Sequence, residues 1–387
     1  MRVDKSKWQK KTIGQIGKVI SGSTPRTDNP SNWEGGTYNW VTPAELKGDK
    51  YYGSTIKKIT DTALESTNLT LMPIGTVLLS SRAPIGKVAI TTEPMYCNQG
   101  FKNIECNSSI HNEFLYYYLR YNNDELNRRG NGVTFKEISK KIVEQFPVIV
   151  PSIEEQKGIA SELDAIQTMI DGYKAQITDL DELANSIFLE TFGDPITNDK
   201  GWKKTKICEE ATVIGGATPR TDNPLNWDCG SLNWVTPAEL KGERYYGQTV
   251  KQITEYAVKN ANLTLLPIGT VLLSSRAPIG KVAITTEPMY CNQGFKNIIC
   301  GKNLVNEYLY QYLLFNNDEL NRRGSGVTFK EISKKVVENF PIILPPIELQ
   351  QQYADNIEAI EKQKALLREQ LADAEQLMAE RMQYYFS

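Results

Sequence analysis

The chain has 387 residues, of which 40% are apolar and 23% are charged, and its formal net charge is −2. This length allows two or three domains with their own cores, and the composition is that of an ordinary soluble globular protein. No apolar run approaches the roughly 20 residues that a membrane span needs, and the first eight residues lack the apolar core of a signal peptide, so we expect a cytoplasmic protein.

The sequence contains an internal repeat, in which the second copy is offset from the first by 194 residues. Residues 24–30 return unchanged as 218–224, and residues 68–104 match 262–298 at every position except Met72, which becomes Leu266. The period is far longer than that of solenoid repeats, so each copy is a whole domain with an appendage. Two nearly identical domains imply a pseudo-twofold object, which suits a twofold target such as duplex DNA.

Each copy begins with a predicted domain of mixed strands and helices, residues 1–151 and 193–345, so the expected fold class is α+β. In the first copy, runs rich in β-branched residues predict strands at 76–80, 87–91 and 147–150. Residues 112–127 predict a helix with an aromatic face, and Gly-, Pro- and Asn-rich residues such as 21–36 predict loops. Thr134 and Glu137 fit a capping box that would open a short basic helix through Lys141.

A long helix is predicted after each domain, at 152–192 and 346–387. In the first helix, apolar residues alternate at spacings of four and three from Ile159 to Ile187, which is an a/d heptad seam. Ser152 and Glu155 form a capping box at its start.

The matching seam of the second helix is interrupted by Lys364 and Arg381. An amphipathic helix about 58 Å long, at 1.5 Å per residue, needs a partner. We expect the two helices to form an antiparallel coiled coil that joins the two domains. The alternative is that each helix packs back on its own domain.

The charge is divided unevenly between these parts. Residues 152–190 carry −7 and residues 346–385 carry −4, so the rest of a chain of net charge −2 carries +9. The domains are therefore basic and the helices acidic. A solvated surface would also tolerate this modest excess, but the asymmetry favours an anionic partner for the domains alone.

The sequence lacks the common catalytic, nucleotide-binding and metal-binding patterns. Its one histidine, His111, is matched by Val305, so histidine catalysis cannot be common to both copies. There is no Gly-rich nucleotide motif, and residues 29–32 and 223–226 are poor matches to an adenine methyltransferase motif. The C-x8-C spacing found in each copy is not that of a zinc site, so we expect reduced thiols and no metal.

Polar and aromatic residues lie beside basic ones in several predicted loops of each copy. Arg and Lys bind guanine O6 and N7, Asn and Gln bind adenine, and Ser and Thr hold phosphates. Amides and tryptophans also serve the fold, and sequence spacing does not separate the two roles. The candidate DNA-binding residues are Thr24, Arg26, Tyr38, Trp40, Arg82, Lys87, Asn98, Gln99, Lys102, Arg128, Arg129, Thr134 and Lys136, with Thr218, Arg220, Trp234, Arg276, Lys281, Asn292, Gln293, Lys296, Arg322, Arg323, Thr328 and Lys330 in the second copy.

Several motifs resemble the target-recognition domains of type I restriction-modification specificity subunits. They are residues 21–25, 78–86, 98–103 and 132–139, with 151–156 at the helix entry and 192–195 at the junction. All except the last recur in the second copy, two of them with changes. The resemblance covers essentially the whole chain.

The resemblance implies a non-catalytic subunit in which two recognition domains each read half of a bipartite DNA site, with a coiled coil as the spacer. The implied partners are double-stranded DNA, two modification subunits and two restriction subunits. S-adenosylmethionine for adenine N6 methylation, and ATP and Mg²⁺ for cleavage, would bind to those partners, and no cofactor would bind to this chain.

The near identity of the two domains departs from the family, whose members commonly carry dissimilar ones. We therefore expect a near-palindromic target with a fixed spacer, although a recent duplication would preserve the identity without any functional demand. Any difference between half-sites is expected near Tyr38/Leu232 and Asn131/Ser325. The rival hypothesis is a scaffold that assembles proteins through its acidic helices and does not touch DNA.

Overall fold

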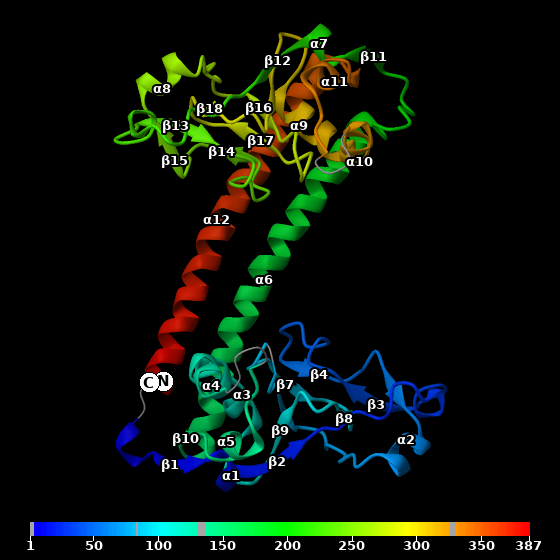
Figure 1. Ribbon diagram of the computed structural model, residues 1–387, viewed down its shortest axis with the longest axis vertical. Coiled ribbons are helices and arrows are strands. Elements are labelled where there is room, and N and C mark those ends of the chain that lie inside the picture. The colour runs from blue at the N-terminus through cyan, green and yellow to red at the C-terminus, as the bar shows by residue number, and fades with distance from the viewer. Residues whose placement is uncertain (1–3, 83, 131–135, 326–329) are drawn as a thin grey trace. The chain divides into compact units, whose positions relative to one another are not determined.

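The computed structural model describes residues 4–82, 84–130, 136–325 and 330–387 (Figure 1). The chain forms two compact units. The first contains the described residues up to Lys174 together with Glu369–Ser387, and the second contains Ala175–Arg368. Each unit therefore holds one copy of the repeated domain and one half of each of two long helices, α6 (Ile153–Phe192) and α12 (Ile347–Phe386).

The domain of the first unit is built on a five-stranded mixed sheet, in the order β2-β9-β6-β7-β4. A three-stranded sheet, β5-β3-β8, and an antiparallel pair, β1-β10, complete it. Its elements are η1 (Lys5–Lys7), β1 (Gln9–Thr12), α1 (Ile13–Ile16), β2 (Gly17–Ser21), η2 (Pro30–Asn32), β3 (Tyr38–Val41), β4 (Tyr51–Tyr52), β5 (Lys58–Ile59), α2 (Asp61–Ser66), β6 (Val77–Leu79), β7 (Val88–Thr91), β8 (Tyr96–Cys97), β9 (Lys102–Cys106), α3 (Asn112–Tyr121), α4 (Asn123–Arg129), α5 (Lys140–Glu144) and β10 (Pro147–Val150).

The second unit repeats this topology, with sheets β12-β19-β16-β17-β14, β15-β13-β18 and β11-β20. Its elements are β11 (Lys203–Lys206), α7 (Ile207–Glu210), β12 (Ala211–Gly215), η3 (Pro224–Asn226), β13 (Leu232–Val235), β14 (Tyr245–Tyr246), β15 (Lys251–Ile253), α8 (Glu255–Asn260), β16 (Val271–Leu273), β17 (Val282–Thr285), β18 (Tyr290–Cys291), β19 (Lys296–Cys300), α9 (Asn306–Phe315), α10 (Asn317–Arg323), α11 (Lys334–Glu338) and β20 (Pro341–Leu344).

The five-stranded sheet is covered on both faces, which explains its continuous apolar strands. In β6, Val77 and Leu79 belong to the core shared with α3, whereas Leu78 belongs to a second core on the opposite face, beside Phe101. All three strand residues are fully buried. The predicted α+β domains, and the strands expected at 76–80, 87–91 and 147–150, are thus confirmed.

The two long helices pair in opposite directions within each unit. In the first unit Glu162 of α6 accepts hydrogen bonds from Arg381 (2.5 Å) and Tyr385 (2.7 Å) of α12, and Lys174 pairs with Glu375 (2.9 Å). Positions rise along α6 as they fall along α12, so the helices are antiparallel, and the predicted coiled coil is confirmed.

The seam of α12 is interrupted in sequence but not in space. In the second unit Lys364 is 4% exposed, and its ammonium group lies 2.6 Å from Asp181 of α6 and 2.8 Å from Glu361. A buried ammonium is tolerated when carboxylates pair with it, so this lysine is part of the packed interface.

Each half-helix also packs against the domain of its own unit. In the first unit the Asp164 carboxylate of α6 accepts hydrogen bonds from the Tyr117 hydroxyl and the Lys50 ammonium, both at 2.6 Å. Packing of a long helix on its own domain, the alternative to the coiled coil, therefore occurs together with it.

Two predicted helices differ in their bounds from the structure. The helix expected at 112–127 is divided into α3 and α4 at Asn122, whose side-chain amide donates to the Tyr118 carbonyl. The helix expected from 134 to 141 begins only at Lys140, because the Ser139 hydroxyl accepts the Ile142 amide and caps it. Thr134, which was predicted to cap this helix together with Glu137, lies outside the described residues. In the described part of the chain, no helix combines the length and apolar character of a membrane span.

Candidate nucleic-acid interface

One carboxylate in the first unit gathers several of the candidate residues. Glu137 lies in extended backbone that forms an isolated β-bridge with Arg82, and the Ile138 amide donates to the Ser81 carbonyl at 2.9 Å. This bridge brings the turn between β6 and β7 against the segment that precedes α5. The Glu137 carboxylate binds the Arg82 Nε at 2.9 Å and the Lys102 ammonium at 3.4 Å. One negative and two positive charges leave this group cationic.

Arg82 is held by one side of its guanidinium only. Its Nε is bound to Glu137, and neither terminal nitrogen has a hydrogen-bond partner among the described residues. The side chain is 48% exposed. Because Arg binds guanine O6 and N7 with its planar fork, a guanidinium fixed through Nε presents the two nitrogens that such a contact uses.

Lys102 connects this group to two further candidates. It is 8% exposed, and its ammonium donates to the Ser81 hydroxyl (3.3 Å) and the Gln99 carbonyl (3.4 Å). The Thr24 hydroxyl donates to the side-chain oxygen of Gln99. We call this set the Glu137 cluster: Thr24, Ser81, Arg82, Gln99, Lys102 and Glu137.

The second unit repeats the cluster almost atom for atom. Arg276 Nε lies 3.0 Å from Glu331, and the Lys296 ammonium lies 3.4 Å from the same carboxylate and 3.2 Å from the Ser275 hydroxyl. The Thr218 hydroxyl donates to Gln293. Arg276 is also 48% exposed, with no partner for its terminal nitrogens in the described chain. We call this set the Glu331 cluster.

Close backbone packing supports the turn that carries Arg82. Gly86 has a φ of +89°, and a Cβ on it would lie 1.7 Å from the Asn123 side-chain oxygen, so only glycine fits this turn. Gly280 has the same environment beside Asn317. The identical turns of the two copies therefore reflect the fold as well as any contact with a ligand.

Other candidates serve the fold. Trp40 is 3% exposed, and its indole donates to the Ser23 carbonyl at 3.1 Å; Trp234 donates to Ala217 in the same way. The Lys87 ammonium donates to the Pro43 and Leu46 carbonyls, both at 2.9 Å. Lys281 does the same at Pro237 and Leu240. These four side chains are occupied by neighbouring backbone.

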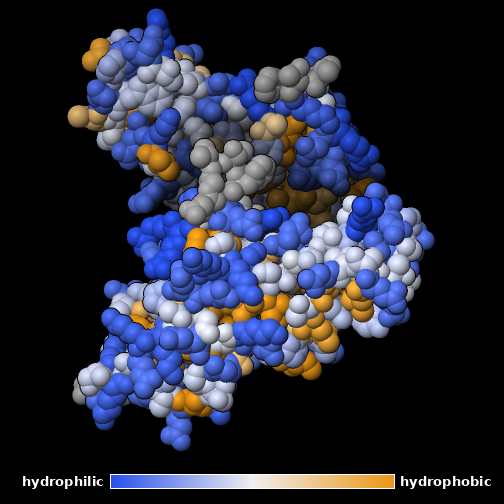
Figure 2. Space-filling view, turned by 60° about the horizontal axis from the view of Figure 1, so that its bottom comes forward, coloured by the Kyte–Doolittle hydropathy of each residue, from blue (hydrophilic) through white to orange (hydrophobic). Residues whose placement is uncertain are grey.

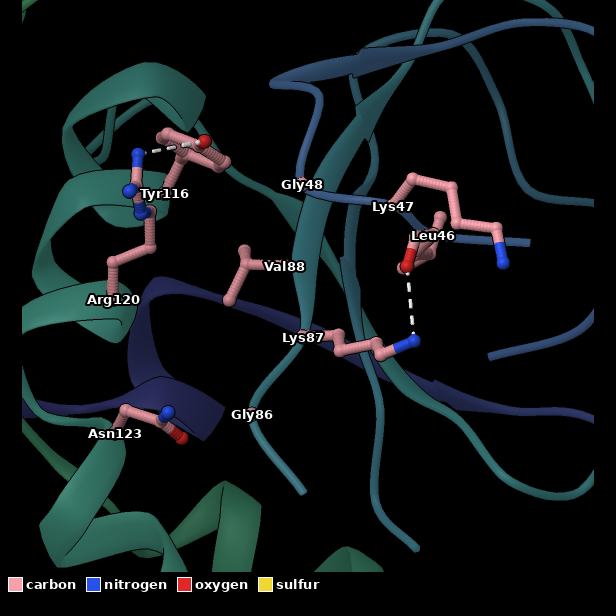
Figure 3. A pocket seen from close by; sticks show the side chains of 9 residues that line it. All are labelled: Leu46, Lys47, Gly48, Gly86, Lys87, Val88, Tyr116, Arg120 and Asn123. Atoms are coloured by element: carbon pink, nitrogen blue, oxygen red, sulfur yellow. Dashed lines mark hydrogen bonds between the residues drawn. The ribbon is translucent and has the colours of Figure 1, made fainter. Parts of the chain in front are cut away.

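A hollow of about 510 Å³ lies beside Lys87 (Figure 3). Lys47, Lys87 and Val88 line one side, and Tyr116, Arg120 and Asn123 line the other. Figure 3 shows the Lys87 ammonium turned to the Leu46 carbonyl, while Arg120 donates to the Tyr116 hydroxyl at 3.0 Å. The position that matches Arg120 is Leu314, so this hollow is more cationic in the first unit than its counterpart in the second.

Among the described residues, the remaining candidate arginines make no hydrogen bond or ion pair with Glu137 or Glu331. Arg128 and Arg129 both bind Glu125 at 2.8 Å, as Arg322 and Arg323 bind Glu319 at 2.9 and 2.8 Å. The main-chain carbonyl of Arg26 accepts a hydrogen bond from the Trp33 indole at 3.0 Å. The side chain of the matching Arg220 binds Asp222 at 3.1 Å. These side chains are exposed or half-buried and remain available to a polyanion.

The last candidates divide between described and undescribed parts of the chain. Asn98 and Asn292 accept the amides of Gly100 and Gly294 at 2.9 Å, and the Tyr38 hydroxyl donates to Asp61 at 2.8 Å. Lys136 and Lys330 are exposed. Thr134 and Thr328 lie outside the described residues, as does Asn131.

On the face drawn in Figure 2, hydrophilic residues predominate and apolar residues lie in scattered groups. Burial raises the pKa of the Cys97 and Cys106 thiols to about 12, as it does for Cys291 and Cys300.

No group of three or more His, Cys, Asp or Glu side chains that could hold a metal ion is found within the described ranges.

The family model for the type I restriction modification DNA specificity domain matches residues 5–180 and again residues 199–376. The chain belongs to this family. A relative, the type I restriction enzyme MjaIX specificity subunit of Methanocaldococcus jannaschii, is 28% identical over 370 residues, which cover 89% of this chain and 85% of the relative. The prediction from the sequence motifs is thus confirmed.

Two solved structures share the fold of this specificity subunit. The S subunit of a type I restriction-modification system from M. genitalium has a TM-score of 0.60 at 13% identity, covering 99% of this chain and 97% of that one. A chain solved in work on complex assembly and conformational transition of the type I R-M system has a TM-score of 0.61 at 20% identity, covering 98% and 97%. The fold is therefore shared across these chains.

Glu137 and Glu331 are the residues that the sequence did not reveal. The motif that contains Glu137 was interpreted as a helix cap, because Thr-x-x-Glu is a common helix start. Its contacts with Arg82 and Lys102 span 55 and 35 positions, and no local pattern encodes such pairs.

Proposed function

We propose that the chain is a non-catalytic subunit whose two domains each read one half of a bipartite, near-palindromic site on double-stranded DNA. The observation that carries the proposal is the guanidinium of Arg82, fixed through Nε by Glu137 with both terminal nitrogens unpartnered in the described chain, and its repetition at Arg276 and Glu331. A pair of equivalent readers in one chain suits a pair of equivalent half-sites.

The charge distribution supports the same proposal. The parts of the chain outside the two long helices carry +9, and exposed Lys and Arg side chains lie in the same domains as the two clusters. Phosphate contacts supply most of the affinity for any duplex, and base contacts select the sequence. The two clusters would select the base sequence, and the exposed lysines would bind the phosphate backbone of the DNA.

The chemistry of modification would come from partners. We propose that two modification subunits, which bring S-adenosylmethionine, and two restriction subunits, which use ATP and Mg²⁺, bind to this chain and are positioned by it. The acidic long helices offer a surface of opposite character to the DNA-facing domains, and we assign the partner contacts to them. A scaffold without any DNA contact is the alternative, and the experiment below distinguishes it.

The test is selection from a library of duplexes with randomised half-sites, using the full chain in complex with its modification subunit. Arg82→Ala should weaken binding to one half-site by about 1–3 kcal/mol for each lost bidentate contact, and Arg276→Ala should do so at the other. Melting temperatures are measured in parallel. A mutant that loses stability but keeps its sequence preference would show that Arg82 only secures the turn.

Two further outcomes bear on the wider proposal. Enrichment of two unrelated half-sites would contradict the near-palindromic target. Absence of any enriched sequence, with the modification subunit still bound to the chain, would favour the scaffold. Glu137→Gln is the matched variant, because it keeps the shape of the residue but removes the charge that fixes Arg82.

A further inference from the structure

The two repeats differ unevenly over their surface. Sixteen of the 37 positions from 31 to 67 differ from their counterparts, whereas one of the 37 positions from 68 to 104 does. Exposure does not account for the contrast. In the first stretch 13 of 18 exposed residues differ, and in the second none of the 11 exposed residues that the structure describes differs.

The variable stretch corresponds to one part of the fold. Residues 31–67 supply most of the small lobe formed by η2, β3, β5 and α2, whose core is Trp40, Ile59 and Ala63 (Figure 1). The invariant stretch supplies β6 to β8 and the first part of β9, and with them Arg82, Gln99 and Lys102 of the Glu137 cluster. The cluster is therefore common to both units. The small lobe carries a dense group of differences, and further differences lie in residues 9–23 and 105–121.

One loop of this lobe has the same backbone hydrogen bonds in both units but carries side chains that differ between them. It comprises residues 53–58 in the first unit and 247–252 in the second, and we call it the variable loop. Its alternate positions are Ser54, Ile56 and Lys58 in the first unit; in the second they are Gln248, Val250 and Gln252. All six are exposed, Ile56 and Val250 at 85%. The glycine, threonine and lysine between them are unchanged.

The same hydrogen bonds hold the backbone of the loop in each unit. Glu45 accepts the Ile56 amide and the Tyr52 hydroxyl, both at 2.8 Å, and Glu239 accepts the Val250 amide at 2.8 Å and the Tyr246 hydroxyl at 3.0 Å.

The threonine of the loop adds a second tie. The Thr55 hydroxyl donates to the Lys57 carbonyl at 2.6 Å and accepts the Trp40 amide at 3.1 Å, and Thr249 repeats both bonds with Lys251 and Trp234. A fixed backbone presenting exposed side chains that differ is suited to binding one kind of ligand with two specificities.

Side chains of the kinds that differ here have different base preferences in DNA. Lysine binds guanine O6 and N7, glutamine binds adenine N6 and N7, and an aliphatic tip contacts the thymine methyl group. A hollow of about 470 Å³, lined by Thr27, Trp33, Ile56 and Lys57 among others, lies beside the loop. The Lys57 ammonium sits 5.7 Å from the centre of the Trp33 ring, and Lys251 sits 5.9 Å from Trp227.

We propose that the variable loop makes the two DNA half-sites alike but not identical, with Lys58 selecting guanine in one half-site and Gln252 selecting adenine at the equivalent base of the other. The inference rests on the proposed function. The bases read by the invariant clusters are common to the half-sites, and the difference is confined to the bases beside this loop.

Exchange of the loop tests the proposal. The full chain in complex with its modification subunit selects sequences from duplexes in which both half-sites are randomised. The first variant carries Ser54→Gln, Ile56→Val and Lys58→Gln. The second carries Gln248→Ser, Val250→Ile and Gln252→Lys. The matched control exchanges exposed α2 residues of the same lobe, Glu65→Lys with Ser66→Asn.

The wild-type complex is expected to select two half-sites that differ by guanine against adenine. Each loop variant should convert its own half-site, so that both variants select perfect palindromes, one of each kind. The preference at the exchanged base should change by roughly 10- to 100-fold. The α2 exchange should leave the selected sequence unchanged.

Other results would overturn the inference. Identical half-sites selected by the wild type would do so, as would unlike half-sites that the loop exchange leaves unconverted or that the α2 exchange converts. Failure of the wild-type complex to select any sequence would instead contradict the proposed function itself.

Discussion

Phe386, near the end of the chain, should stabilise the domain at the beginning of the chain. It is 4% exposed, and its ring lies 5.5 Å from Phe114, 5.6 Å from Tyr118 and 5.8 Å from Tyr121. Removal of a buried Phe side chain costs about 3–5 kcal/mol, which includes the cavity that it leaves. Since the last turn of α12 can partly collapse into that space, we expect Phe386→Ala to destabilise the first unit by about 3 kcal/mol.

Hydrogen exchange with mass spectrometry measures this change one unit at a time. A loss of about 3 kcal/mol should speed exchange of the protected amides of α3 by roughly 100-fold and leave those of α9 near their wild-type rates. These two helices differ in sequence, so their peptides can be told apart, whereas peptides from residues 73–104 and 267–298 have the same mass.

Phe192→Ala is the matched control, because Phe192 is the position equivalent to Phe386. It is fully buried in the second unit, with Tyr308 at 4.8 Å and Tyr353 at 5.5 Å. We expect the reverse pattern, with faster exchange in α9 alone. If Phe386→Ala sped exchange equally in α3 and α9, or left α3 unchanged, the division of α12 between the two units would be wrong.

Three further predictions follow from named groups. Burial alone would raise the pKa of Glu162, but hydrogen bonds from Arg381 and Tyr385 lower it from 4.5 to about 2. Its contribution to stability is therefore complete above about pH 4.5 and is lost as the pH falls through about 2. Glu162→Gln should be less stable than wild type at pH 7, and in denaturant titrations the difference should shrink steadily as the pH is lowered to 2. In alkylation with iodoacetamide at pH 8, the exposed Cys208 and Cys229 should react. The buried Cys97 and Cys291 and the partly buried Cys106 and Cys300, whose thiol pKa is raised to about 12, should not; rapid labelling of Cys97 would refute this. Lys136→Ala should weaken binding to all duplexes alike and reduce the slope of log K against log salt by about 0.9, and a change in the selected sequence would show that Lys136 reads bases.

Sequence alone determined the parts of this protein whose cause is local or repetitive. The 194-residue repeat predicted two like domains, and the four-and-three spacing from Ile159 to Ile187 predicted the long helix and its apolar seam. The antiparallel pairing followed from pseudo-twofold symmetry. Six motifs taken together, among them 21–25 and 78–86, indicated the family.

The tertiary structure decided which residues meet. Lys364 looked like a break in the seam, but Asp181, 183 positions away, makes it part of the interface. Glu137 looked like a helix cap, but it fixes Arg82 across 55 positions, while Trp40 and Lys87, chosen as DNA ligands, bind backbone carbonyls. Periodicity predicts the face of a helix or strand on which a residue lies. It does not predict which residue it contacts on that face, because that contact depends on how distant segments pack.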